Sequence, residues 1–92
     1  MSDKVSTEIQ IINERGLHAR AAANFVKSID GFDACIEVER LGQTVDGYSI
    51  MGLMMLAASK GTSINISATG PDAQKALDAL TNLINNKFGE EQ

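Results

Sequence analysis

Hydrophobic and polar residues alternate along three stretches of the chain, at residues 5–11, 34–38 and 62–69. An alternation with a period of two is typical of a strand that buries one face and leaves the other in solvent. The second stretch is followed by a turn at residues 41–43, so residues 44–45 are expected to pair back as a hairpin. We therefore expect four short strands, each with one polar face.

The spacing of the apolar residues changes to that of helices in three places. The first helix is predicted from residue 18, because apolar side chains recur on one face until Gly31, a residue type common just after helix ends. The second helix is predicted over residues 50–58, which are mostly apolar. The residues expected on its inward face are Leu53, Leu56 and Ala57.

The third predicted helix follows a Gly-Pro-Asp sequence, which places Pro71 at the first helical position. Its apolar stripe runs from Ala73 to Phe88, and the tail at residues 89–92 is expected to be frayed. The element order is then β-α-β-β-α-β-α. Four strands with one polar face and three helices with apolar stripes favour an α+β fold, in which the helices cover one face of a largely antiparallel sheet.

Composition and charge narrow the classes of function. The chain has 92 residues, which predicts a single domain over residues 1–92 with its core at about residues 4–88 and no deep substrate cavity. A net charge of −4 argues against nucleic acid, and no apolar run is long enough to span a membrane. One His and one Cys allow neither an internal disulfide nor a four-ligand zinc site. We expect a cytoplasmic monomer without a secretory leader, metal or other cofactor.

The junction between the first strand and the first helix carries the main candidate chemistry. Gly16 permits a tight backbone there, His18 lies at the helix start, and Arg20 follows two residues later. A helix N-terminus binds anions through its free N–H groups, so an imidazole there is a candidate nucleophile whose phosphorylated product would lie in a favourable field. The guanidinium of Arg20 matches the geometry of phosphate oxygens. A His at a helix start is more often a polar capping or surface residue, and this alternative stays open.

The second predicted helix contributes two further features. Ser49 is expected to be its N-cap, without the acidic partner of a capping box because residue 52 is Gly. The expected partly exposed residues are Ile50, Met51 and Met54, which would form a soft apolar docking surface. Alternatively, the methionines fill gaps in a small core.

Two of these segments resemble a known family. The segment GLHARAA at residues 16–22 resembles the active-site segment of HPr, the histidine-containing phosphocarrier protein of the bacterial phosphotransferase system. Residues 49–54 resemble the family's regulatory serine segment, and residues 60–62 resemble the turn after it. Residues 31–34 and 68–71 are similar to the nitrogen-related branch of the family, often called NPr. The similarity covers most of the chain.

The resemblance implies an open-faced β-sandwich with a four-stranded antiparallel sheet packed on three helices. It implies that enzyme I, charged by phosphoenolpyruvate, phosphorylates Nδ1 of His18, and that His18 passes the group to a histidine of an enzyme IIA protein while Arg20 helps to hold it. Ser49 matches the serine that HPr kinase/phosphorylase modifies in many bacteria. The protein would then be a carrier and not an enzyme with its own turnover. The positions implied for partner docking are Arg15, Ala19, Asn24, Lys27, Ile50, Met51 and Met54.

The chain departs from the family pattern at two positions. Ala21 stands where the family usually has Pro, and Ala does not preset the backbone φ angle. Tyr48 precedes Ser49 where many relatives have Lys. The NPr-like segments also support an alternative function, a regulatory interaction protein of the nitrogen-type branch that acts through its phosphorylation state and partner binding and not in sugar uptake. A small-ligand-binding module is disfavoured by the thin core.

Overall fold

The computed structural model describes residues 4–91; residues 1–3 and 92, at the ends of the predicted domain, lie outside the described part. The elements are β1 (Val5–Gln10), α1 (Ala19–Ile29), β2 (Cys35–Arg40), β3 (Gln43–Asp46), α2 (Ile50–Met55), β4 (Ser63–Thr69), α3 (Ala73–Asn85) and the 3₁₀ turn η1 (Lys87–Gly89). This order confirms the predicted α+β class and the β-α-β-β-α-β-α succession.

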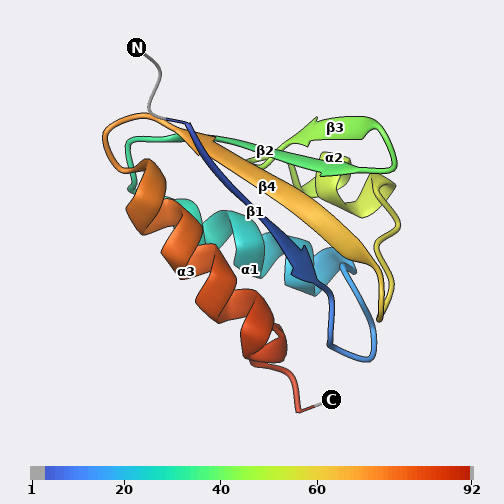
Figure 1. Cartoon of the computed structure of the whole chain (residues 1–92). Coiled ribbons are helices and arrows are strands. Elements are labelled where there is room, and N and C mark those ends of the chain that lie inside the picture. The colour runs from blue at the N-terminus through green and yellow to red at the C-terminus, as the bar shows by residue number, and fades with distance from the viewer. Residues whose placement is uncertain (1–3, 92) are drawn as a thin grey trace.

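The sheet has the strand order β1-β4-β2-β3, and every neighbouring pair is antiparallel. Helices α1 and α3 lie across one face of the sheet, and α2 packs beside β3 (Figure 1). Alternation along β4 explains this arrangement, because Ile64 and Ile66 are fully buried while Ser63 and Asn65 are exposed. Side chains from both layers meet in the core, whose largest fully buried members include Phe25, Ile29, Leu53, Ile64, Ile66, Leu80 and Ile84.

The hairpin between β2 and β3 turns on two residues. Leu41 and Gly42 both have positive φ angles, of 53° and 84°, which is the conformation that two-residue hairpins favour. The predicted turn is therefore confirmed, although Gln43 already pairs with Arg40 as the first residue of β3.

The predicted second helix begins at Ile50 as expected, but α2 has six residues and ends at Met55, so its predicted extension to residue 58 is wrong. The backbone leaves the helical conformation at Ala57, whose φ is 51°, and Arg40 Nη1 donates a hydrogen bond to the Leu56 carbonyl at 3.0 Å. Leu53 and Leu56 are buried as predicted. Because the chain turns at residue 57, Ala57 is exposed and Ala58 takes the inward position in its place.

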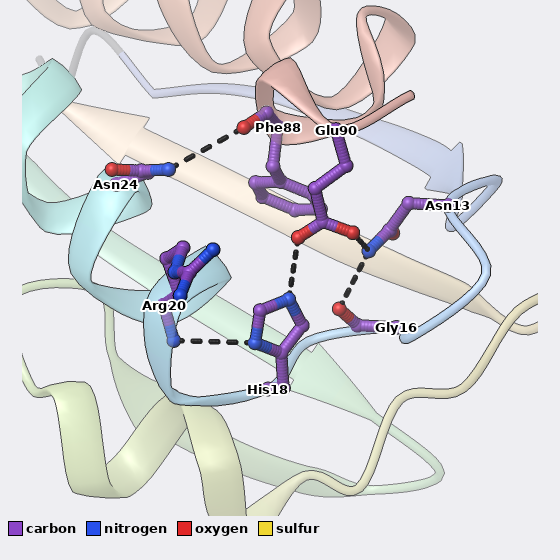
Figure 2. A network of polar contacts seen from close by, with 7 residues as sticks. All are labelled: Asn13, Gly16, His18, Arg20, Asn24, Phe88 and Glu90. Carbon is purple, nitrogen blue, oxygen red and sulfur yellow. Dashed lines mark hydrogen bonds and ion pairs between the residues drawn. The ribbon is translucent and has the colours of Figure 1, made fainter. Parts of the chain in front are cut away.

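Helix α3 also differs from the prediction at both ends. It begins at Ala73 with Asp72 as the N-cap, so Pro71 precedes the helix and is not its first residue. It ends at Asn85, after which Phe88 adopts a left-handed conformation with a φ of 56°. Phe88 is nevertheless buried, as its place in the apolar stripe predicted. This turn directs the following residues back towards the start of α1 (Figure 2).

Candidate functional site

The site begins with a tight loop that follows β1. Gly16 has a φ of 66°, and a Cβ atom at this position would lie 2.5 Å from the carbonyl oxygen of Ala58. The next N–H group, that of Leu17, donates a hydrogen bond of 2.9 Å to the same oxygen, and the Leu17 side chain is buried. Only glycine fits this close approach without strain, so the loop is held directly against the connection between α2 and β4.

His18 occupies the N-cap position of α1, at the helix start that the sequence predicted. Its Nδ1 atom accepts a long hydrogen bond of 3.3 Å from the backbone N–H of Arg20, and its Nε2 atom pairs with the Glu90 carboxylate (Figure 2). The side chain of His18 keeps 18% of its exposure to solvent. Because a backbone N–H is a donor, it meets an unprotonated nitrogen at Nδ1, and the ring proton is therefore on Nε2.

Glu90 contradicts the prediction that the tail after residue 88 is frayed; Gln92, the last residue of that predicted tail, lies outside the described residues. The Oε1 atom of Glu90 accepts a 3.0 Å hydrogen bond from Nδ2 of Asn13, and its Oε2 atom contacts His18. Partial burial alone raises the pKa of the Glu90 carboxyl, but the hydrogen bonds from Asn13 and His18 and the positive charge of Arg15 outweigh it and lower the pKa below its ordinary value. The carboxylate is therefore ionised at neutral pH.

Asn13 connects the tail to the loop. It is fully buried, and its Nδ2 atom also donates a 2.8 Å hydrogen bond to the Gly16 carbonyl. Its Oδ1 atom has no hydrogen-bond partner among residues 4–91. Neither Asn13 nor Glu90 was predicted as a site residue, and the only signal in the sequence was the position of Asn13 inside the segment that leads to His18.

The two arginines of the site line an open hollow of about 440 Å³ beside Glu90. Arg15 lies in the loop and Arg20 in the first turn of α1, and both are exposed. The acidic residues around this hollow are Glu14, Glu90 and Glu91. The hollow therefore places two guanidinium groups, whose geometry matches phosphoryl oxygens, among three carboxylates at the first turn of α1.

Ser49 is the N-cap of α2, and its Oγ accepts a 2.9 Å hydrogen bond from the Gly52 N–H, as its position predicted. Apart from the buried Leu53, the apolar residues of this helix are exposed and do not fill the core. Their exposed fractions are 40% for Ile50, 75% for Met51, 42% for Met54 and 66% for Met55. Met55 belongs to the same surface and was not among the residues predicted for it, although it lies one helical turn after Met51.

The remaining predicted docking residues lie along α1. Ala19 and Lys27 are exposed, but Lys27 lies in the last turn, about 10 Å along the helix axis from Arg20 at 1.5 Å per residue. Asn24 is half-buried, and its Nδ2 atom donates a 3.4 Å hydrogen bond to the Phe88 carbonyl. The structure thus brings Arg15, Ala19 and Arg20 around His18, directs Asn24 to the tail, and leaves Lys27 remote from the ring.

Residues 4–91 contain neither a candidate membrane span nor a candidate metal cluster. This part of the chain has no helix long and apolar enough to cross a bilayer. It also has no group of three His, Cys, Asp or Glu side chains close enough to hold a metal ion.

Comparison with known proteins shows that the fold and this site belong to the class of phosphocarrier domains of the phosphotransferase system. The family model described as "PTS HPr component phosphorylation site" matches residues 5–86. The chain is 49% identical over 80 residues to the phosphocarrier protein HPr of Cupriavidus necator, covering 87% of this chain and 90% of that protein. It is 50% identical over 84 residues to the HPr of Pseudomonas aeruginosa, covering 90% of this chain and 93% of that protein.

A solved structure agrees with these relatives. The crystal structure of HPr-C-His from Thermoanaerobacter tengcongensis superposes with a TM-score of 0.91 at 44% identity, covering 96% of this chain and 99% of that one. The chain therefore belongs to the HPr family, and this membership gives it a phosphocarrier role in the phosphotransferase system.

Proposed function

We propose that this chain accepts a phosphoryl group on Nδ1 of His18 from enzyme I, charged by phosphoenolpyruvate, and passes it to a histidine of an enzyme IIA protein. The observation that supports this most is the orientation of the ring. Its Nε2 atom is engaged by Glu90, and its Nδ1 atom meets only one long hydrogen bond at the exposed start of α1. A weak bond of this kind is easily exchanged for a bond to phosphorus.

The start of α1 then stabilises the phosphorylated ring to a moderate degree. The N–H groups of the first turn lack partners within the helix, since the first helical bond runs from the Ala22 N–H to the His18 carbonyl. A helix end of this kind stabilises an exposed anion by about 0.3–1 kcal/mol. Arg20 adds a guanidinium that can donate two parallel hydrogen bonds to phosphoryl oxygens. Stabilisation on this scale holds the group without trapping it, which a reversible carrier requires.

The donor and the acceptor are proposed to dock on a shared surface. Its apolar part is formed by Ile50, Met51, Met54 and Met55 on α2, which packs against α1 beside the site. Its basic part is formed by Arg15 and Arg20. An exposed apolar patch with a charged border is typical of a protein interaction surface. The carrier has no turnover of its own in this proposal, because the reacting group comes from one partner and leaves on another.

Ser49 is proposed as a regulatory phosphorylation site for an HPr kinase/phosphorylase. A phosphate on an N-cap residue suits the local helix dipole, so the fold is expected to tolerate it. Its negative charge would nevertheless lie within the docking surface, next to the exposed Ile50 and Met51. The modification is therefore expected to weaken docking of an acidic partner surface.

The test is phosphate transfer with purified components. Wild type, His18→Ala and Ser49→Ala are incubated with enzyme I and labelled phosphoenolpyruvate, and acid-labile phosphate is counted. Wild type and Ser49→Ala are expected to be labelled and His18→Ala is not. An unlabelled wild type, or label retained in His18→Ala, would contradict the proposal.

The loaded protein is then offered to enzyme IIA proteins of the sugar-permease and nitrogen-type branches, and the acceptor that discharges it identifies the branch.

The proposed state is a cytoplasmic monomer that needs no metal, cofactor or nucleic acid. Size-exclusion chromatography with light scattering tests the oligomeric state, and a mass near 9.8 kDa is expected for the monomer.

A further inference from the structure

The tail after α3 returns to the site and is fixed there at several points. Phe88 is buried at 3% exposure, and its carbonyl accepts the hydrogen bond from Asn24. Two residues later, the two carboxylate oxygens of Glu90 have different partners, Nε2 of His18 and Nδ2 of the fully buried Asn13. Figure 2 shows this bridge from the tail to both ends of the loop. A carboxylate held at both oxygens has a defined orientation towards the ring.

We infer that Glu90 is a positioning residue for phosphoryl transfer, which fixes the His18 ring as the Nε2–H tautomer and keeps this proton on the ring throughout the transfer cycle. The inference rests on the proposed function, in which His18 is the phosphoryl acceptor. An ionised carboxylate can only accept a hydrogen bond, so its contact with Nε2 requires a proton on that nitrogen. The neutral ring carries one proton, and Nδ1 is therefore left with its lone pair.

A second contact supports the same tautomer independently. The backbone N–H of Arg20 points at Nδ1 from 3.3 Å, and a donor in that position disfavours a proton on Nδ1. Glu90 supplies the stronger of the two restraints, because its bond is charge-assisted and both of its partners are partly or fully shielded from solvent. The side chains of His18 and Glu90 are only 18% and 17% exposed.

The proton on Nε2 also matters for the bond changes. In loading, the Nδ1 lone pair forms a bond to phosphorus, and the bond from phosphorus to the donor breaks with its electron pair leaving on the donor. The ring then carries a substituent on each nitrogen and a positive charge, which the Glu90 carboxylate offsets. In unloading, a lone pair of the acceptor bonds to phosphorus, the bond from phosphorus to Nδ1 breaks, and its electron pair returns to Nδ1. No proton enters or leaves the ring in either step.

The same balance explains why loss of the proton would be costly. Without it, the ring would have to leave phosphorus as an imidazolate anion, a poor leaving group. The carboxylate therefore favours a loaded ring that can still be discharged. The other charged groups near the site are Glu14, Arg15, Arg20 and Glu91, which line the same hollow as Glu90. Glu91 is exposed and forms no hydrogen bond with His18 within the described residues, so it provides a control with the same charge and almost the same position.

The tautomer is tested in the unphosphorylated protein by long-range ¹H–¹⁵N spectra of the His18 ring at slightly alkaline pH. The variants are Glu90→Ala, Glu90→Gln and the control Glu91→Gln. Wild type, Glu91→Gln and Glu90→Gln are expected to have a bare Nδ1 and a protonated Nε2, since the Gln oxygen can also accept a hydrogen bond. Glu90→Ala is expected to give the averaged nitrogen shifts of two exchanging tautomers. A wild-type spectrum in Glu90→Ala would overturn the inference.

The role of the charge is tested in onward transfer from the loaded proteins as a function of pH. A carboxylate favours the protonated ring, so removing its charge in Glu90→Gln is expected to make discharge decline at a lower pH than in wild type. Glu90→Ala is expected to discharge about 5- to 30-fold more slowly, the effect of losing about 1–2 kcal/mol, and Glu90→Asp to recover part of the rate. Identical profiles in wild type, Glu91→Gln and Glu90→Gln would overturn the inference while leaving the proposed function intact. An unlabelled wild type would instead contradict the proposed function, whatever the tautomer.

Discussion

Substitution of Gly16 by Ala tests whether the site depends on close contact between its loop and the connection after α2. The new Cβ would lie 2.5 Å from the Ala58 carbonyl oxygen and 2.9 Å from the Ser59 Cα, and both are backbone atoms that cannot rotate away. The residue would also have to keep a φ of 66°, which costs a residue other than glycine about 1–2 kcal/mol. Overpacking typically costs a further 1–3 kcal/mol, roughly.

The sum predicts that Gly16→Ala lowers the free energy of unfolding by about 2–5 kcal/mol. For a chain of this size, each kcal/mol lowers the melting temperature by about 4–8 °C, so a fall of about 8 °C or more is expected. The assay is unfolding in guanidinium chloride followed by far-ultraviolet circular dichroism, with the dependence on denaturant compared between variants to check that the transition stays two-state.

Gly42→Ala is the matched control for backbone strain without a clash. Gly42 has a φ of 84°, and a Cβ atom there would have no neighbour within 4 Å. This variant is expected to lose only the cost of the left-handed backbone, about 1–2 kcal/mol. If Gly16→Ala proves no less stable than Gly42→Ala, the loop is free to move away from Ala58, and the reasoning about the site's rigidity is refuted.

Three further predictions concern the cap, the docking surface and the tail. Ser49→Ala is expected to lower the free energy of unfolding by about 0.5–2 kcal/mol, because the cap of α2 is lost. Ser49→Asp is expected to keep the cap but to lose phosphoryl transfer from enzyme I, and equal stability of the two variants would contradict the role of the cap. Met51→Lys is expected to raise the KM of enzyme I for this carrier at unchanged stability, whereas the control Leu41→Lys at the exposed hairpin is expected to leave this KM unchanged. Equal KM values for the two variants would argue against docking on α2. Because folding lowers the pKa of Glu90, its carboxylate contributes its full stabilisation when the pH is above 4.5, the ordinary pKa of the group. This stabilisation is lost as the pH falls through the lower pKa of the folded protein. The stability difference between wild type and Glu90→Gln in urea should therefore shrink below pH 4.5, and a difference independent of pH would contradict this.

The sequence predicted the order of the elements because each carries its own local pattern. Alternation in β4 and the apolar stripe of α1 match the buried faces of the structure. The ends of α2 and α3 were not predictable in this way. Apolar residues continue past the end of α2 to Ala58, and Phe88 continues the apolar stripe of α3 through a left-handed turn. In both places the pattern of buried residues extends beyond the last helical residue.

The candidate site was predictable only where it is local in sequence. His18, Arg20 and Gly16 lie within five residues of one another, and their roles follow from a turn and a helix start. The contact between His18 and Glu90 joins residues 72 positions apart. A polar tail is typical of a frayed end, and its ordering here depends on the burial of Phe88 and on the amide of Asn13, which are consequences of the folded chain.

The most direct test of the central claim is the nitrogen to which phosphorus becomes bonded. Wild type labelled with ¹⁵N in its histidine ring is phosphorylated by enzyme I and phosphoenolpyruvate, and scalar couplings between ³¹P and the ring nitrogens are measured. The orientation of the ring predicts a coupling to Nδ1 of His18, with Nε2 still bonded to its proton. A coupling to Nε2, or no coupling to the ring of His18, would contradict the account.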